Sequence, residues 1–331
     1  MVMNKRLSYL LTLVTVAALV VTMAGCGEDD KYEGLNLRPS SSLNNQGNNG
    51  QSNEENSEDE QRPSTPASTV EASGSLEDTV RMEVPVLKEG NYFVSHYTTE
   101  QGGLKVMSYC YEWDPTKNHT RWVAFRFDNV TRVKSANVGR TEAWDDDPDL
   151  PEQWHVGTAT FKGYTRGHLC ASADRQYSRE ANAQTFYMSN MSPQEYNFNA
   201  YYWGELESLV RNCGQNSSFA DTLYVVKGGY IDNSSDLIGY VSRGNGLQVA
   251  IPGHYFMALL AYDKGSYSSI GFWVAHDSKG YNTYPPRSVL ANDAVSIDRL
   301  EELTGIDFFH HLPDNIEKAV EATCDFNDWN R

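Results

Sequence analysis

Three short motifs in this chain contain side chains capable of acid–base and metal chemistry. They are, in order, Tyr164-Thr-Arg-Gly-His168-Leu-Cys-Ala-Ser-Ala-Asp174-Arg175, Ser189-Asn-Met-Ser-Pro-Gln194, and Asn199-x3-Trp203-x3-Glu207. Together they supply an imidazole that could act as a base, an arginine, an amide and a carboxylate. Metal-assisted cleavage of a phosphodiester bond needs this set of groups.

The tripeptide Arg166-Gly167-His168 is the centre of the first motif. An imidazole titrates near neutral pH and can take a proton from water. A guanidinium can form paired hydrogen bonds with phosphate oxygens, and Gly167 would let the backbone approach a ligand closely. Taken alone, the tripeptide fits a turn with a hydrogen-bonded histidine and an exposed arginine better than a catalytic site. The choice between a simple turn and a catalytic site therefore depends on the other motifs.

The third motif lies in residues 199–212, a segment without proline that ends at Cys213-Gly214, which predicts a helix with a glycine stop. At about 100° per residue, Asn199 and Glu207 lie within roughly 80° of each other on one face of such a helix. The Asn199 amide oxygen is a hard ligand suited to Mg²⁺, and Glu207 could order water around that ion. The alternative is an amphipathic helix without a ligand, and Trp203 is expected in the core in either case.

The segments around these motifs predict a single α+β domain with a largely antiparallel sheet. Aromatic and β-branched runs predict strands, and Ser296–Leu303, closed by Thr304-Gly305, predicts a surface helix. Residues 144–154 are expected to form a loop, because they contain two prolines and an acidic run. The predicted strands are residues 92–97, 104–112, 121–128, 185–189, 223–226, 248–262 and 270–275.

From about Met82 to the C-terminus, the chain resembles the DNA/RNA non-specific endonucleases of the ββα-metal type, a family that includes mitochondrial endonuclease G. The resemblance rests on the three motifs in their order and spacing, and on the stretch Leu303-Thr-Gly-Ile-Asp-Phe-Phe309. It implies a ββα-metal nuclease fold, with a central, mostly antiparallel sheet flanked by helices. It also implies sequence-non-specific hydrolysis of DNA, RNA or both with Mg²⁺, or alternatively Mn²⁺.

The resemblance further implies a role for each matching residue. His168 matches the general base, Asn199 the single direct metal ligand, and Glu207 the acid that orders metal-bound water. The residues that match phosphate-contacting arginines are Arg166, Arg211 and, at a looser spacing, Arg140; those at supporting positions are Asn190 and Thr165. For Arg211, an ion pair with Glu207 is an equally good interpretation of the helical spacing.

One position departs from the family pattern. The family usually has aspartate where this chain has Thr165. A carboxylate there would help to hold the waters of the cation, whereas threonine can only form uncharged hydrogen bonds. The change could weaken metal binding, alter the preferred metal, or be tolerated.

The N-terminus has the layout of a lipoprotein signal peptide over residues 1–25. Lys5 and Arg6 precede an apolar run, residues 7–23, and Ala24-Gly25-Cys26 follows it. This pattern predicts lipidation of Cys26 and anchoring to the outer membrane of the cell envelope, in the manner of Bacteroidetes surface lipoproteins. An ordinary secreted protein is the alternative.

Residues 26–80 are rich in polar and acidic residues and almost free of large apolar ones, which predicts a disordered tether. Residues 1–26 carry a charge of +2 and residues 27–80 a charge of −9, which leaves −10 of the total of −17 on the predicted nuclease domain, residues 81–331. This balance argues against tight, sequence-independent DNA binding. It allows a nuclease that contacts its substrate transiently through a local basic cleft.

The four cysteines after Cys26 could form two disulfides in any of three pairings, or remain free thiols. They are Cys110, Cys170, Cys213 and Cys324.

Two other functions remain open from the sequence. The chain has 20 Tyr, 12 Phe and 7 Trp, which would also suit a surface-anchored module that binds glycans or mediates adhesion, provided that the rings are exposed. A nuclease homologue weakened by Thr165 is the other alternative. The oligomeric state is not indicated by any pattern.

Overall fold

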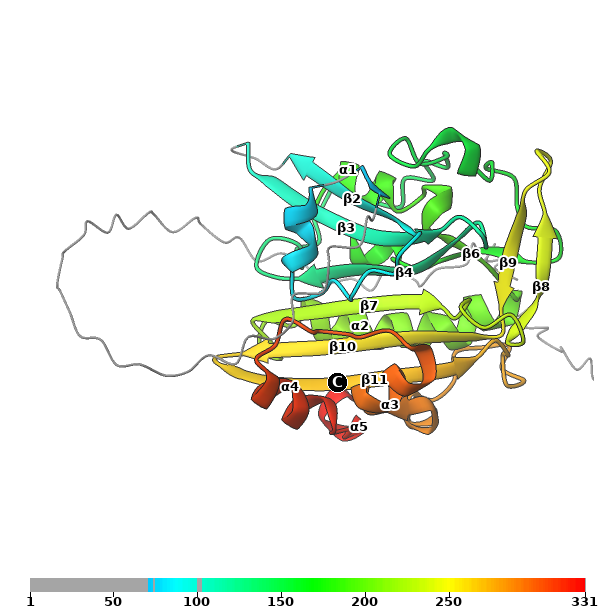
Figure 1. The fold of residues 1–331 in the computed structure, drawn as a ribbon. Helices are drawn as coiled ribbons and strands as arrows, with labels where there is room; N and C mark the ends of the chain where they lie inside the picture. Colours follow the sequence, from blue (N-terminus) through cyan, green and yellow to red (C-terminus); the bar gives the residue numbers. More distant parts are fainter. Residues whose placement is uncertain (1–70, 74, 100–102, 331) are drawn as a thin grey trace, which may run out of the picture.

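The computed structural model describes residues 71–73, 75–99 and 103–330. The predicted signal peptide, Cys26 and most of the predicted tether lie outside these residues. Within them, the central sheet has eight strands in the order β1-β2-β3-β4-β7-β10-β11-β12 (Figure 1). β1 runs parallel to β2, and the other neighbouring strands are antiparallel. The predicted α+β class with a largely antiparallel sheet is confirmed.

The strands of the central sheet are β1 Glu71–Ala72, β2 Tyr92–Thr99, β3 Lys105–Asp114, β4 His119–Phe127, β7 Thr222–Gly229, β10 His254–Asp263, β11 Ser266–Ala275 and β12 Ala294–Val295. Two hairpins stand apart from it: β5 Thr165–His168 with β6 Met191–Gln194, and β8 Leu237–Ser242 with β9 Gln248–Pro252. The α-helices are α1 Arg179–Gln184, α2 Gly204–Gln215, α3 Ile297–Thr304, α4 Asp314–Glu321 and α5 Phe326–Trp329. The 3₁₀ helices are η1 Leu76–Val80, η2 Glu152–Trp154, η3 Ser172–Asp174, η4 Met188–Asn190 and η6 Arg287–Asp293, and η5 Phe198–Trp203 is a π-helix.

The predicted strands hold in most places and are wrong in two. Residues 185–189 form a turn and the start of η4, because Thr185 folds back on Asn182 through its hydroxyl, and the strand begins only at Met191. The run 248–262 is two strands, β9 and β10, broken at Gly253. A Cβ on Gly253 would lie 2.0 Å from the Asp236 carbonyl oxygen, so this position tolerates only glycine.

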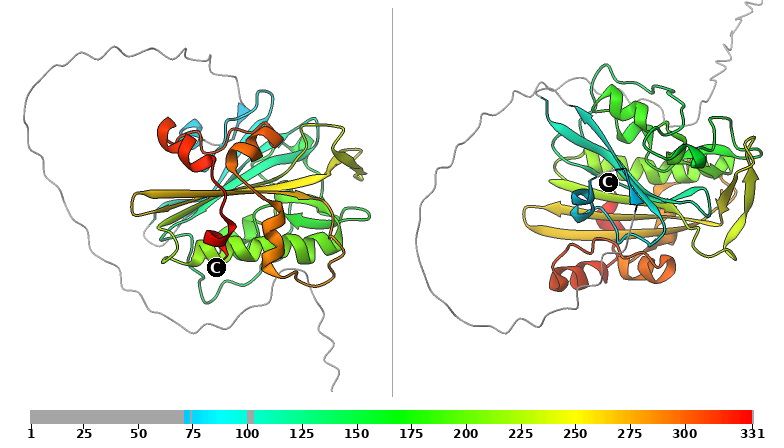
Figure 2. Two further views of the ribbon diagram at one scale, coloured as in Figure 1. Left: turned by 90° about the horizontal axis from the view of Figure 1, so that it is seen from below. Right: turned by 45° about the horizontal axis from the view of Figure 1, so that its top comes forward.

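The hydrophobic core lies on both faces of the sheet. On β4, Val123 and Phe125 join the larger cluster, which includes α2, while Trp122 and Ala124 join a second cluster with α3. Figure 2 shows α2 on one face and α3 and α4 on the other. Alternating residues of a strand point to opposite faces of the sheet. A strand that is covered by core residues on both faces is therefore apolar along its whole length. Most aromatic residues of the strands are buried or packed against these clusters, with Tyr240 on β8 as an exposed exception, which weakens the support for the adhesive alternative.

The tether was predicted to extend to residue 80, but the structure has regular elements within residues 71–80. Residues 71–72 pair with Tyr92 and Phe93 as β1, and η1 follows. Asp78 in η1 is buried and accepts hydrogen bonds from the hydroxyls of Ser95, at 2.6 Å, and Tyr97. A polar segment is thus ordered by specific hydrogen bonds, which composition alone does not reveal.

Cys110, Cys170, Cys213 and Cys324 are all free thiols, and the first three are buried. The sequence left open either two disulfides or free thiols, and the structure has free thiols at these four positions. In the part of the chain that the structure describes, no helix is long and apolar enough to cross a membrane.

A buried histidine joins β2 to the acidic loop. Nε2 of His96 lies 2.9 Å from Asp147 Oδ2, and its Nδ1 lies 3.2 Å from Asp149 Oδ2. Burial alone would lower the pKa of His96, but the two carboxylates outweigh it and raise the pKa to about 9. The imidazolium therefore fixes the loop that follows Trp144.

We expect the replacement His96→Gln to destabilise the fold in a pH-dependent way. The pKa of His96 is higher in the folded state, about 9, than the usual 6.5 or so. Its ion-pair contribution is therefore complete below about pH 6.5 and is lost as the pH rises through about 9. Urea unfolding should show that the variant's deficit in unfolding free energy shrinks by about 3 kcal/mol between about pH 6 and 10. An equal deficit at both pH values would contradict an ionised His96.

Candidate active site

The β5–β6 hairpin presents the Arg-Gly-His tripeptide. His168 pairs with Met191 and Thr165 with Gln194 across the two antiparallel strands. A Cβ on Gly167 would lie 2.0 Å from Gln194 Oε1. The packing of a neighbouring side chain therefore requires glycine at this position.

His168 is buried and remains able to accept a proton. Its ring packs against Phe186 at 5.1 Å and Trp144 at 5.7 Å between ring centroids. Its Nε2 is buried without a hydrogen-bond partner among the described residues. Burial, followed by the positive charges of Arg140 and Arg166, lowers the pKa of His168 well below the usual 6.5. The imidazole is therefore neutral at physiological pH, as a base must be.

Asn199 lies in the π-helix η5, which runs directly into α2. The predicted continuous α-helix from residue 199 is thus wrong at its first turn, and the 80° angle between Asn199 and Glu207 does not apply. The helix also continues to Gln215 instead of stopping at Gly214. A Cβ on Gly214 would lie 2.3 Å from the Phe127 ring, so this glycine serves packing. Single π-turns inside helices often occur at functional sites.

Thr165 fixes the orientation of the Asn199 amide. Asn199 Nδ2 donates to Thr165 Oγ1 at 3.0 Å, and Thr165 Oγ1 in turn donates to the Gln194 carbonyl oxygen at 2.9 Å. Because the amide nitrogen is held by Thr165, the carbonyl oxygen Oδ1 is turned away from it. That oxygen is the atom that would bind a hard cation. Threonine at this position thus orients the predicted ligand without contributing charge.

We expect Thr165→Val to reduce the affinity for the metal, or the activity, by about 10–100-fold, because contacts that orient a metal ligand have effects of this size. Thr165→Ser keeps the hydroxyl and should remain close to wild type. The measurement is cleavage rate against Mg²⁺ concentration for the three proteins. If valine and serine behave alike, the hydroxyl does not orient Asn199.

Glu207 is buried on α2, 5% exposed. Burial raises its pKa to about 7, with Asp174 adding to the rise and Lys227, Arg211 and Arg140 opposing it. A buried carboxylate with a raised pKa is stabilised in its charged form when a cation or a cation-bound water lies beside it.

Arg211 forms an ion pair with Asp174, and its positive charge also lowers the pKa of Glu207. Arg211 Nε lies 3.1 Å from Asp174 Oδ1, and Lys227 Nζ lies 3.2 Å from Asp174 Oδ2. Asp174 is therefore a buried carboxylate that holds two cations next to Glu207. Sequence reasoning missed Lys227, because it comes from β7, far along the chain.

Arg166 and Arg140 flank Trp144 beside His168. The Arg166 guanidinium lies 3.5 Å above the Trp144 ring, and its Nη1 donates to the Thr158 carbonyl at 2.8 Å. Arg140 lies 4.7 Å from the Phe186 ring centroid and donates to Ser172 Oγ at 3.2 Å. Trp144 was assigned only to a loop from the sequence. Its ring contacts both Arg166 and His168, so it positions the predicted base and a predicted phosphate contact together.

Asn190 is buried and lies beneath the site. Its amide accepts from the Cys170 N–H at 2.8 Å and donates to the carbonyls of Cys170 and Thr185. It therefore fastens the segment after β5 to the segment before β6, a supporting role in line with the expectation. The structure thus gathers the other seven predicted site residues around one location: His168, Arg166, Asn199, Glu207, Arg211, Arg140 and Thr165.

Comparison with known proteins identifies the family. The model of the DNA/RNA non-specific endonuclease family matches residues 89–315. The chain belongs to this family. Two relatives are a mitochondrial nuclease EXOG from Xenopus laevis, 29% identical over 223 residues, and a nuclease from Nostoc sp., 31% identical over 224 residues. The matches cover 64% and 66% of this chain and 59% and 76% of those relatives, so the chain spans about three fifths of the EXOG length.

A solved structure shares the nuclease-family fold. The crystal structure of the EndoG/EndoGI complex contains a chain that superposes with a TM-score of 0.52 at 19% identity. It covers 67% of this chain and 88% of that one. At this level of identity the likeness concerns the fold, and it supports the ββα-metal nuclease architecture predicted from the motifs.

Proposed function

We propose that this member of the endonuclease family hydrolyses phosphodiester bonds of DNA, RNA or both, with His168 as the general base. The observation that carries the proposal is the neutral, buried imidazole whose Nε2 has no described partner, beside the arginines Arg140 and Arg166. Phosphate contacts carry no sequence information, so cleavage should show little sequence preference.

In the proposed reaction, the His168 imidazole takes a proton from a water molecule. The water oxygen forms a bond to phosphorus while the bond from phosphorus to O3′ breaks, and solvent protonates the departing oxygen. The products are a 5′-phosphate and a 3′-hydroxyl. Arg166 and Arg140 would stabilise the negative charge on the phosphate oxygens.

The donor set fits a single hard cation, which we propose to be Mg²⁺, with Mn²⁺ as the alternative. Asn199 Oδ1, oriented by Thr165, would bind it directly, and Glu207 would act through water. When bound, such an ion neutralises charge on the reacting phosphate. Magnesium commonly binds through one or two protein oxygens and keeps several waters, which suits this sparse set.

The acidic balance of the chain is compatible with this proposal because three arginines lie at the site, of which Arg140 pairs with Glu142 and Arg211 with Asp174. Arg140, Arg166 and Arg211 lie around His168 and Glu207. The positive charge of Arg140 lowers the pKa of both His168 and Glu207. A transient contact with a phosphate backbone needs such a local field and not a basic protein overall.

The cellular location is a separate proposal that rests on the sequence alone. We propose that residues 1–25 are removed, that Cys26 is lipidated, and that residues 26–70 tether residues 71–331 to the outer membrane. Mass spectrometry of the membrane fraction should find a diacylglyceryl group on Cys26. Wild-type protein recovered without lipid in the soluble fraction would reject the anchor.

The nuclease proposal is tested by incubating the purified protein with plasmid DNA and with total RNA, in Mg²⁺ and in EDTA. We expect cleavage of at least one substrate in Mg²⁺ and none in EDTA. Folded protein that cleaves neither substrate in Mg²⁺, Mn²⁺ or Ca²⁺ would indicate a family member that has lost activity.

A further inference from the structure

The helices α3 and α4 lie on the face of the sheet opposite α2 (Figure 2), and acidic side chains from both helices lie close together. Asp298 and Glu301 lie three residues apart on α3, and Glu317 and Glu321 lie four apart on α4. Such spacings place side chains on one face of a helix. Carboxylate oxygens of Asp298, Glu301 and Glu321 lie within 4.8 Å of one another.

Glu321 makes this more than a surface cluster of acids. It is only 3% exposed, and its Oε1 is buried without a hydrogen-bond partner among the described residues. A buried, unpartnered carboxylate oxygen is costly unless a cation or a proton compensates it. The one arginine on α3, Arg299, pairs with Glu302 instead.

The charges that act most strongly on Glu321 are negative. Burial, then Glu301, Glu317, Asp298 and Asp307, raise the pKa of Glu321 to about 9. By contrast, the other group of metal-binding residue types, around His96, is satisfied by its own ion pairs.

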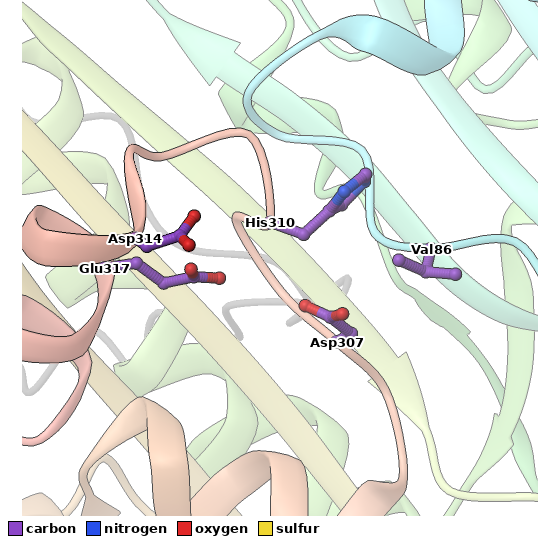
Figure 3. A pocket seen from close by; sticks show the side chains of 5 residues that line it. All are labelled: Val86, Asp307, His310, Asp314 and Glu317. Carbon is purple, nitrogen blue, oxygen red and sulfur yellow. The ribbon is translucent and has the colours of Figure 1, made fainter. Parts of the chain in front are cut away.

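A polar pocket adjoins the cluster. It is lined by Val86, Asp307, His310, Asp314 and Glu317, and Figure 3 shows the carboxylates of Asp314 and Glu317 next to each other there. Glu317 therefore belongs to the pocket and also acts on Glu321. Asp307 and Glu317, which line the pocket, thus extend the negative charge beside the cluster.

We propose that Asp298, Glu301 and Glu321 form a Ca²⁺ site that joins α3 to α4. Calcium binds carboxylate oxygens at about 2.3–2.6 Å, so two oxygens on one ion are at most about 5 Å apart. The 4.8 Å limit among the three carboxylates meets this condition. Calcium tolerates irregular oxygen sets, whereas Mg²⁺ demands near-octahedral geometry and Zn²⁺ favours nitrogen and sulfur ligands.

The test is thermal unfolding of metal-stripped Asn199→Ala protein during a CaCl₂ titration. The Asn199 change removes the proposed catalytic ligand, so the result does not depend on the nuclease site. Saturating calcium should raise the melting temperature by about 5–10 °C, the size expected at roughly a hundredfold excess over Kd. Adding Asp298→Asn or Glu321→Gln should abolish that rise.

The matched control is Glu302→Gln on the same helix, which should keep the full calcium response. Asp298 is exposed, so Asp298→Asn provides the test even if Glu321→Gln fails to fold. The proposal is overturned if calcium does not raise the melting temperature, or if the rise persists in the Asp298 variant. An equal rise with MgCl₂ at the same concentration would overturn the assignment to calcium.

Discussion

Replacing His168 with alanine should lower the cleavage rate by about 10²–10⁴-fold, the usual contribution of a general base. The loss should appear in kcat at saturating Mg²⁺, because the imidazole is proposed to act on the attacking water and not on the metal. The measurement is the initial rate of plasmid or RNA cleavage, whichever the wild type cleaves, over a range of substrate concentrations.

The alanine variant must be shown to fold, since His168 is buried against Trp144 and Phe186. A cooperative unfolding transition and an unchanged Mg²⁺ dependence of the residual activity would show this. His311→Ala is the matched control, because His311 lies in the segment before α4, where its Nε2 bonds to the Thr79 carbonyl and its ring packs against His310. If His168→Ala keeps more than a tenth of the wild-type rate, His168 is not the base.

Replacing Asn199 with alanine should cost at least about 100-fold in activity at a fixed, low Mg²⁺ concentration. A contact that only orients a ligand is worth about 10–100-fold, and Asn199 is proposed to be the ligand itself. The loss of activity in Asn199→Ala should become smaller as the Mg²⁺ concentration is raised, if Glu207 still attracts the ion. Rates over a Mg²⁺ titration separate this effect from a loss of the base.

Asn199→Asp makes the comparison sharper. The aspartate restores a metal-binding oxygen, but it cannot donate to Thr165 Oγ1 as the amide does. We therefore expect it to recover part of the lost activity. Asn245→Ala, in the exposed turn between β8 and β9, is the control and should not change the Mg²⁺ dependence. Equal Mg²⁺ dependence of wild type and Asn199→Ala would remove Asn199 from the metal site.

The sequence by itself indicated the candidate site residues, the family and the class of fold that holds them. The motifs around His168, Asn199 and Glu207 are local patterns, and alternation along β2, β3 and β4 is a local consequence of strand geometry. The helix α3 was also predicted from a local pattern. Its start is fixed by the Ser296 side chain, which accepts from the Arg299 N–H, and its end by Gly305 at φ 66°.

Only the tertiary structure decided how these residues are held. The amide of Asn199 is oriented by Thr165 from the β5–β6 hairpin, Arg211 is taken by Asp174, and Gly167 is needed by Gln194. Trp144 joins the site by stacking on Arg166. Each of these contacts joins segments separated in the sequence, and its strength depends on distance, burial and competing partners. A local pattern contains none of those quantities, so they exist only once the chain has folded.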